Sequence, residues 1–421
     1  MLDRAYRQRL EADLAKWEAG GLLTPAALTA IRATLPPLAP GINIPVVLAI
    51  VGGLLISAAF LAFVAAHWIE LARLARLAIL FSGSVAAYGI GGWFARGDRP
   101  VLADLCAGVG SIIFGAAIAL VGQMYHLGGD FAAGMLLWSI GALAAAALTG
   151  SRGALAVALA AASLWSCTRI FDLHDPQFSF LAVWLIAAGL VLAWNSRVAA
   201  HLVGLSALPW WIAASLQFDG RNVEPTFVLA DGAALLFGAG LLLAAARWQR
   251  VSSFGVVLST YGAFALACVA ALEVATVNEF FHGRSWIASQ PMWAILCGVA
   301  GAIFAIAAAA ATRQAGAAFA AGATGLVLVA GTVWTPVGAS EPWFAYAFEL
   351  AAMLCLVISG MLEASRPRVV AGWIGIAGVI AGITWAVRGS LLRRSVFLAL
   401  AGASAIVLAT GLNRLLPRTG K

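Results

Sequence analysis

The sequence predicts an all-α membrane protein: a polytopic bundle of about fourteen transmembrane helices behind a short N-terminal helical head. Of its 421 residues, 63% belong to the hydrophobic set and only 10% are charged, and the mean hydropathy is +0.97. Soluble chains carry about 25% charged residues, so a soluble globular protein is excluded. A helix needs roughly 20 apolar residues to cross a bilayer, and the chain is long enough for well over ten such spans.

The first 42 residues differ from the rest because they are rich in charge. Their apolar residues recur at spacings of three and four, at Leu2, Tyr6, Leu10, Leu14 and Trp17. This pattern predicts one amphipathic helix. Gly20 and Gly21 end it, and Thr24 followed by Pro25 starts a second. We expect residues 1–42 to form a helix-turn-helix head on the membrane surface or against the cytoplasmic helix ends, either a topological anchor or a docking site for a partner.

Residues 43–416 form the predicted transmembrane bundle, in which apolar runs follow one another with short breaks. The predicted spans are 44–66, 75–94, 101–121, 131–149, 153–168, 178–195, 198–216, 226–246, 253–274, 291–311, 315–334, 343–363, 369–387 and 395–414. The fifth run is short for a span, and the break at residues 194–197 between the sixth and seventh is thin.

The basic residues predict the orientation of the bundle. If both termini share one side, 17 of the 25 Lys and Arg residues lie on that side and eight lie opposite. The positive-inside rule then places both termini in the cytoplasm. The bias also favours an even number of spans, since a single missed helix would destroy the alternation.

Other classes of protein and site find little support in the sequence. The five cysteines stand singly inside apolar runs, with no pattern for a disulfide or metal site. The net charge of +7 fits topology and contact with anionic headgroups, because no basic run suggests nucleic acid. We expect no metal, no cofactor and no nucleic-acid partner.

Two predicted spans carry stripes of small residues. They are Gly108, Ser111, Gly115, Ala119 and Gly122 in the third span, and Gly372, Gly375, Gly378 and Gly382 in the thirteenth. Such stripes allow close approach of another helix. They predict packing faces or, alternatively, surfaces that slide during a conformational change.

Polar side chains that could bind a ligand gather on the side opposite the termini. They are His67, Trp68, Glu70, Arg73 and Arg76 after the first span, Gln123, Tyr125, His126 and Asp130 after the third, and Arg388, Arg393 and Arg394 before the last. Arginine is disfavoured on this side, and its guanidinium group matches phosphate and carboxylate. The set therefore predicts a site for an anionic ligand, with snorkelling toward lipid headgroups as the alternative.

The same segments carry a resemblance to an uncharacterised family of bacterial predicted membrane proteins known only as a domain of unknown function. The matching features are Trp17 with the turn at residues 20–24, Ala65-Ala66-His67-Trp68 ending the first span, Gly122 to His126, Gly129-Asp130, and Leu136-Leu137-Trp138. His67 stands where the family usually has Asn. The resemblance is most specific over residues 1–150 and implies a multi-pass membrane protein, but no reaction.

The segment around His126 has three interpretations. His67 and His126 could act as acid and base with Glu70 and Asp130, they could bind a ligand, or they could cap helix ends at the membrane boundary. No fingerprint of a known enzyme class stands in a suitable context. We therefore assign no catalytic residue, and an enzyme is the less favoured interpretation.

Ionisable residues inside the spans are rare: Asp104, Asp231, Glu273, Glu349 and Glu363. We expect Asp104, Asp231 and Glu273 to reach water, since they stand near predicted span ends. Glu349 stands deeper, and an intramembrane carboxylate is a default functional candidate, as in proton relays. The sequence thus makes Glu349 a candidate coupling residue.

These features rank three functions for a bacterial inner-membrane protein whose first partner is the lipid bilayer. The first is a transporter or flippase-like carrier of an anionic or lipidic envelope molecule, because many spans and close-packing helix faces suit alternating access. The second is an enzyme acting on a lipid-linked substrate at the outer face, and the third a non-catalytic envelope scaffold. Protein partners and oligomeric state are not predicted.

Overall fold

The structure, a computed structural model, describes residues 4–34, 44–67, 71–124, 130–217, 225–280, 291–333 and 343–386. Within these ranges the chain forms fifteen helices and no strand. The described part of the chain therefore has the predicted all-α, polytopic fold.

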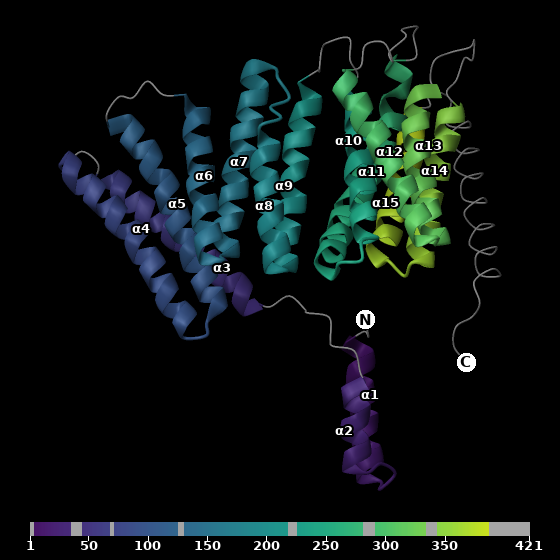
Figure 1. The fold of residues 1–421 in the computed structure, drawn as a ribbon, viewed down its shortest axis with the longest axis horizontal. Coiled ribbons are helices and arrows are strands. Elements are labelled where there is room, and N and C mark those ends of the chain that lie inside the picture. The colour runs from purple at the N-terminus through teal and green to yellow at the C-terminus, as the bar shows by residue number, and fades with distance from the viewer. Residues whose placement is uncertain are drawn as a thin grey trace.

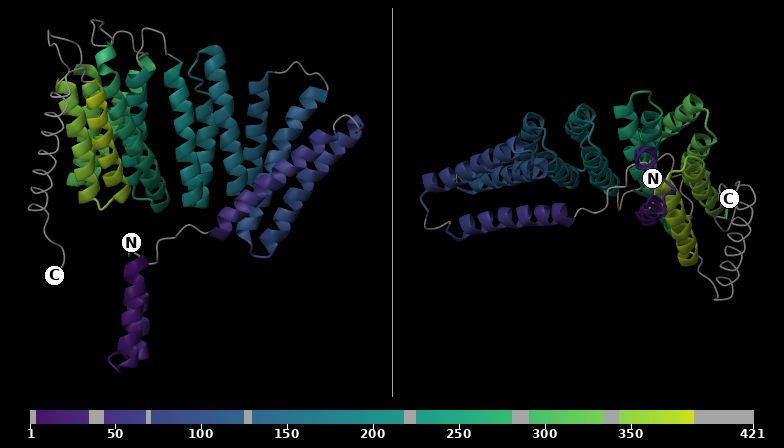
Figure 2. Two further views of the ribbon diagram at one scale, coloured as in Figure 1. Left: turned by 180° about the vertical axis from the view of Figure 1, so that it is seen from behind. Right: turned by 90° about the horizontal axis from the view of Figure 1, so that it is seen from below.

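The head is a hairpin of two helices, α1 (Arg4–Ala19) and α2 (Pro25–Thr34). Leu14 of α1 and Leu28 of α2 are buried. The Thr24 hydroxyl accepts a hydrogen bond from the amide of Ala27 at 3.3 Å, as expected for an N-cap. Figures 1 and 2 show this hairpin below the other helices and clear of them.

The following helices coincide closely with the predicted spans. They are α3 (Ile44–Ala66), α4 (Arg73–Arg96), α5 (Pro100–Met124), α6 (Phe131–Thr149), α7 (Arg152–Leu173), α8 (Phe180–Trp194), α9 (Arg197–Leu216), α10 (Pro225–Ala244), α11 (Gln249–Phe280), α12 (Met292–Thr312), α13 (Ala315–Val333), α14 (Trp343–Leu362) and α15 (Arg366–Ala386). The predicted fourteenth span, 395–414, lies outside the described residues.

Most of these helices are long enough to cross a membrane. In the described residues, eleven meet the length and hydropathy expected of a span, and two shorter apolar helices, Phe180–Trp194 and Ala315–Ala330, accompany them. The fifth span is longer than its apolar run suggests, because α7 continues past Thr168 to Leu173 and ends at His174 in a left-handed conformation. The thin break after α8 is a true turn, with Asn195 left-handed and the Ser196 hydroxyl capping α9.

The helices form two groups that meet at one seam. Helices α3 to α9 follow one another in an extended array, whereas α10 to α15 close a six-helix ring in the order α10, α12, α13, α14, α15, α11. The view from below in Figure 2 shows the array at one side and the ring at the other. One hydrophobic core belongs to each group, and α11 contributes to both. The two groups meet where α8 and α9 face α10 and α11.

The glycine stripes are packing faces. On α15, a Cβ at Gly375 would lie 2.2 Å from the sulfur of Met353, and one at Gly378 would lie 2.7 Å from the Cβ of Ala271. On α5, Gly108 faces the backbone of Gly153, and the indole of Trp138 covers Gly115. Close helix approach accounts for these glycines, whereas Gly122 has nothing within 4 Å of its Cβ direction and Ser111 is hydrogen-bonded to the hydroxyl of Tyr88.

The alternation of the helices brings several basic turns to one end of the bundle. Consecutive helices run in opposite directions (Figure 1), so the basic turns between α6 and α7, α8 and α9, α10 and α11, and α14 and α15 lie at one end of the bundle. We call this the basic end.

A fusion experiment tests which side of the membrane the basic end occupies. We expect a reporter active only in the cytoplasm to work after Lys421, and one active only outside to work in the turn at Gly128-Gly129, because 17 of the 25 basic residues favour that orientation. Opposite activities at the two positions would show that the orientation is reversed.

Candidate functional site

Two described members of the predicted ligand set have local contacts only. His67 follows α3 and is exposed; its Nδ1 lies 3.0 Å from the carbonyl of Phe63, one turn earlier. Gln123 is exposed near the end of α5. For these two residues, no described contact reaches another member of the set.

Asp130 has a structural role at the start of α6. Its Oδ1 accepts a hydrogen bond from the amide of Ala132 at 3.0 Å, which caps the helix. Its other oxygen pairs with Arg169 of α7. This ion pair joins the ends of two neighbouring helices. It gives a structural reason for Arg169, an arginine on this side that was not among the predicted ligand residues.

Of the remaining members, Arg76 of α4 has a local contact, because its Nε donates to the carbonyl of Leu71 at 2.9 Å. Arg73 is the first residue of α4. Outside the described residues lie Trp68, Glu70, Tyr125, His126, Arg388, Arg393 and Arg394. The anionic-ligand site therefore stays a prediction.

The ring of helices α10 to α15 encloses carboxyl groups. Glu349 of α14 is 0% exposed and Glu273 of α11 is 1% exposed. They lie on helices α14 and α11, which contact each other inside the ring, and Ala270, Val274 and Ala352 on the same two helices are buried as well. The predicted depth of Glu349 is thus confirmed, and the structure adds Glu273 as its neighbour.

The expectation that Glu273 and Asp231 reach water is wrong. Helix α11 continues to Phe280, beyond the predicted end at 274, so Glu273 lies about two turns inside the helix. Asp231 of α10 is only 8% exposed, and a Cβ at Gly298 of α12 would lie 2.0 Å from its Oδ1. Glycine at 298 therefore leaves the space that this carboxyl group occupies.

Asp104, by contrast, fastens two helices together. Its carboxylate accepts hydrogen bonds from the amide of Arg152 at 3.0 Å and from Nε of the same residue at 2.9 Å. A carboxylate at a helix N-terminus is favoured by the helix dipole. Asp104 thereby holds the start of α7 against α5.

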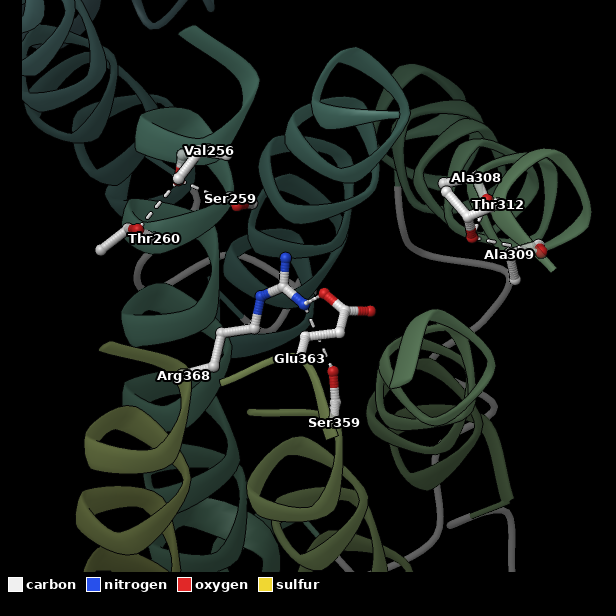
Figure 3. Close-up of polar contacts among 9 residues, drawn as sticks. All are labelled: Val256, Ser259, Thr260, Ala308, Ala309, Thr312, Ser359, Glu363 and Arg368. Carbon is white, nitrogen blue, oxygen red and sulfur yellow. Dashed lines mark hydrogen bonds and ion pairs between the residues drawn. The ribbon is translucent and has the colours of Figure 1, made fainter. Parts of the chain in front are cut away.

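Glu363 is also structural. Figure 3 shows its carboxylate beside the guanidinium group of Arg368, across the turn between α14 and α15. The same guanidinium group donates to the hydroxyl of Ser359 at 3.4 Å. The Arg368 side chain is 7% exposed and that of Glu363 is 20% exposed, so this ion pair at the basic end of the ring is largely buried.

A cluster of aromatic rings, which the sequence analysis missed, lies at the seam between the two helix groups. Its members are Phe178, Phe180, Trp210, Trp211 and Trp293, with neighbouring ring centroids 5.5–6.3 Å apart. They come from α8 and the turn before it, α9 and α12. The indole of Trp211 also donates to the carbonyl of Val228 on α10 at 3.0 Å.

An apolar cavity of about 620 Å³ lies at the same seam. Helices α8, α9, α10 and α11 all contribute to its lining, which includes Trp184, Trp211, Ala239 and Cys268. No signal in the sequence marks it, because each of these helices is apolar on several faces. Among the described residues, no group of three or more His, Cys, Asp or Glu side chains could hold a metal ion.

The comparisons bear on one part of the chain. Residues 15–155 match the model of a family described as predicted membrane protein (DUF2157). The match confirms the resemblance over the segment that carries its motifs, and it describes a membrane domain of unknown function. No curated protein and no solved structure matches the chain.

Proposed function

We propose that this protein is a transporter, a flippase-like carrier of an anionic or lipidic envelope molecule, and that proton movement through Glu349 is coupled to transport. The observation that carries the proposal is the pair of buried carboxyl groups, Glu273 and Glu349, inside the membrane-spanning ring. A carboxyl group inside a transmembrane segment is costly to charge and is by default a functional candidate, as in proton relays. Two negative charges on neighbouring carboxyl groups repel each other, and protonation of one of them would relieve that repulsion.

The position of the pair suits coupling. Helix α11 carries Glu273 on its ring side, and on its other side it contacts α8 and α9 of the first helix group. A change in the charge of the pair changes how well α11 packs against α14. The same helix can therefore transmit a protonation event to the seam. In alternating access, the two helix groups move against each other, and the seam between them opens and closes.

Further parts of the proposal come from the sequence. We place the protein in the bacterial inner membrane with both termini in the cytoplasm. The residues that would bind the polar part of a transported molecule are the predicted outer set, from His67 to Arg394. No specific observation on the described residues favours the enzyme or scaffold alternative.

Replacing Glu349 tests the coupling. We expect purified protein in vesicles to move a phospholipid with a fluorescent headgroup faster when a pH gradient is imposed. The Glu349→Gln variant should lose this gradient dependence, with a rate about tenfold lower, because its side chain is permanently neutral. Chemical quenching of the exposed fluorophore measures the rate.

A matched control removes a different carboxylate. Asp172 is exposed near the end of α7, so Asp172→Asn should keep the dependence on the gradient. A wild-type protein that is indifferent to the gradient, or a Glu349→Gln variant that responds to it fully, would contradict proton coupling.

A further inference from the structure

At the seam between the helix groups, aromatic side chains pack against glycines. A Cβ at Gly232 of α10 would lie 1.7 Å from Cε2 of Trp211 on α9. A Cβ at Gly204 of α9 would lie 2.7 Å from Cδ2 of Tyr261 on α11, whose hydroxyl lies 3.3 Å from Nδ1 of His201. Two large rings thus bridge the seam and hold its walls apart, and the cavity lies between those walls.

The cavity lies mainly in one half of the bundle's depth. Its lining runs from Ala207 to Leu216 on α9, a helix that starts at the basic end with Arg197. On α11, which also starts there, the lining runs from Leu258 to Leu272. The cavity therefore lies mainly in the half away from the basic end, although its lining on α10 and α11 extends past the middle of each helix, to Ala239 and Leu258. It lies within the apolar stretches that span the membrane.

The cavity reaches the surface of the bundle. Ile212, Leu216 and Leu272 line it and are each more than two-fifths exposed. Cys268, which also lines it, is exposed. A surface at this depth faces lipid hydrocarbon rather than water, so the side chains at the mouth indicate an entrance from within the bilayer.

We infer that this cavity is a binding site for a hydrocarbon chain of a membrane lipid, which enters sideways from the leaflet opposite the basic end. Its size falls in the range of ordinary ligand pockets, and almost everything that lines it is aliphatic or aromatic. Within the bilayer, the molecules at its mouth are lipid chains. As the substrate class of the carrier, this inference rests on the proposed function.

Photolabelling with a lipid tests the site directly. Purified protein is placed in phosphatidylglycerol vesicles that contain a small fraction of the same lipid with a diazirine in one acyl chain, and no pH gradient is applied. After illumination, mass spectrometry locates the labelled residues. We expect labelling to be enriched around Ala207, Ala265 and Cys268, above the level on lipid-facing helix surfaces.

Filling the cavity should remove this labelling. Ala265 lines the cavity from α11, and Ala265→Phe should lower labelling there about tenfold, since the ring displaces several methylene groups of the chain. Ala207→Phe fills it from α9 and serves if the first variant does not fold. Val256→Phe is the matched control, because Val256 is exposed on the same helix outside the cavity, and it should change nothing.

The outcomes separate this inference from the proposed function. The Glu349→Gln variant should be labelled like the wild type, because binding needs no gradient. A variant that is labelled normally and still responds fully to the pH gradient would therefore overturn only the coupling. Uniform labelling of all lipid-facing surfaces would overturn the lipid site. Labelling that persists in both filled variants would also overturn the lipid site. The same holds if the cavity residues stay unlabelled because another protein segment covers them.

Discussion

The Gly238→Ala variant should unfold far more readily than the wild-type protein. Helices α10 and α12 approach so closely that a Cβ at Gly238 would lie 2.0 Å from the carbonyl oxygen of Gly301. The obstructing atoms are backbone, which cannot rotate away, so the two helices must separate. We expect the free energy of unfolding to fall by about 3 kcal/mol, the upper part of the range for overpacking. Titration with SDS in mixed micelles, followed by circular dichroism, measures it.

The same substitution at an open position should have the opposite sign. Gly189 lies in α8 with nothing within 4 Å of its Cβ direction. Alanine is favoured over glycine in a helix by roughly 0.5–1 kcal/mol, so Gly189→Ala should stabilise the protein slightly. Equal stabilities of the two variants would show that α10 and α12 are not in backbone contact.

Loss of Arg368 should have an equally large effect. The Arg368→Met variant leaves Glu363 without its partner in a largely buried position against the start of α13. Removing one member of a buried ion pair typically costs about 3–5 kcal/mol. We expect a decrease of that size in the same unfolding measurement, because water cannot fully solvate the remaining carboxylate.

Two further variants define the cause. The double variant Arg368→Met with Glu363→Gln should recover most of the stability, since the uncompensated charge is gone. Arg32→Met breaks the pair with Glu11 in the head, where the Arg32 side chain is 48% exposed, and should cost less than about 1 kcal/mol. If Arg368→Met costs no more than Arg32→Met, the ion pair does not hold the turn between α14 and α15.

The linear sequence determined much of the architecture. The described helices include the charged head and thirteen helices at the predicted spans, eleven of them long enough to cross a membrane, and their basic turns alternate as predicted. These features depend on local quantities: hydropathy over about 20 residues, helix start and stop residues, and the placement of arginine. The glycine stripes of α5 and α15 could also be assigned, because only small side chains permit close helix contact.

The tertiary structure decided which residues face one another. A helix that is apolar on all sides gives no sign of its buried face, so nothing in α9, α10 or α11 shows that Trp211 covers Gly232 or that a cavity lies beside them. Glu273 could be taken for a residue near water only while α11 was assumed to end at 274. Its burial beside Glu349 follows from the rotation and pairing of α11 and α14, and that pairing arises from contacts between segments some 76 residues apart in the chain.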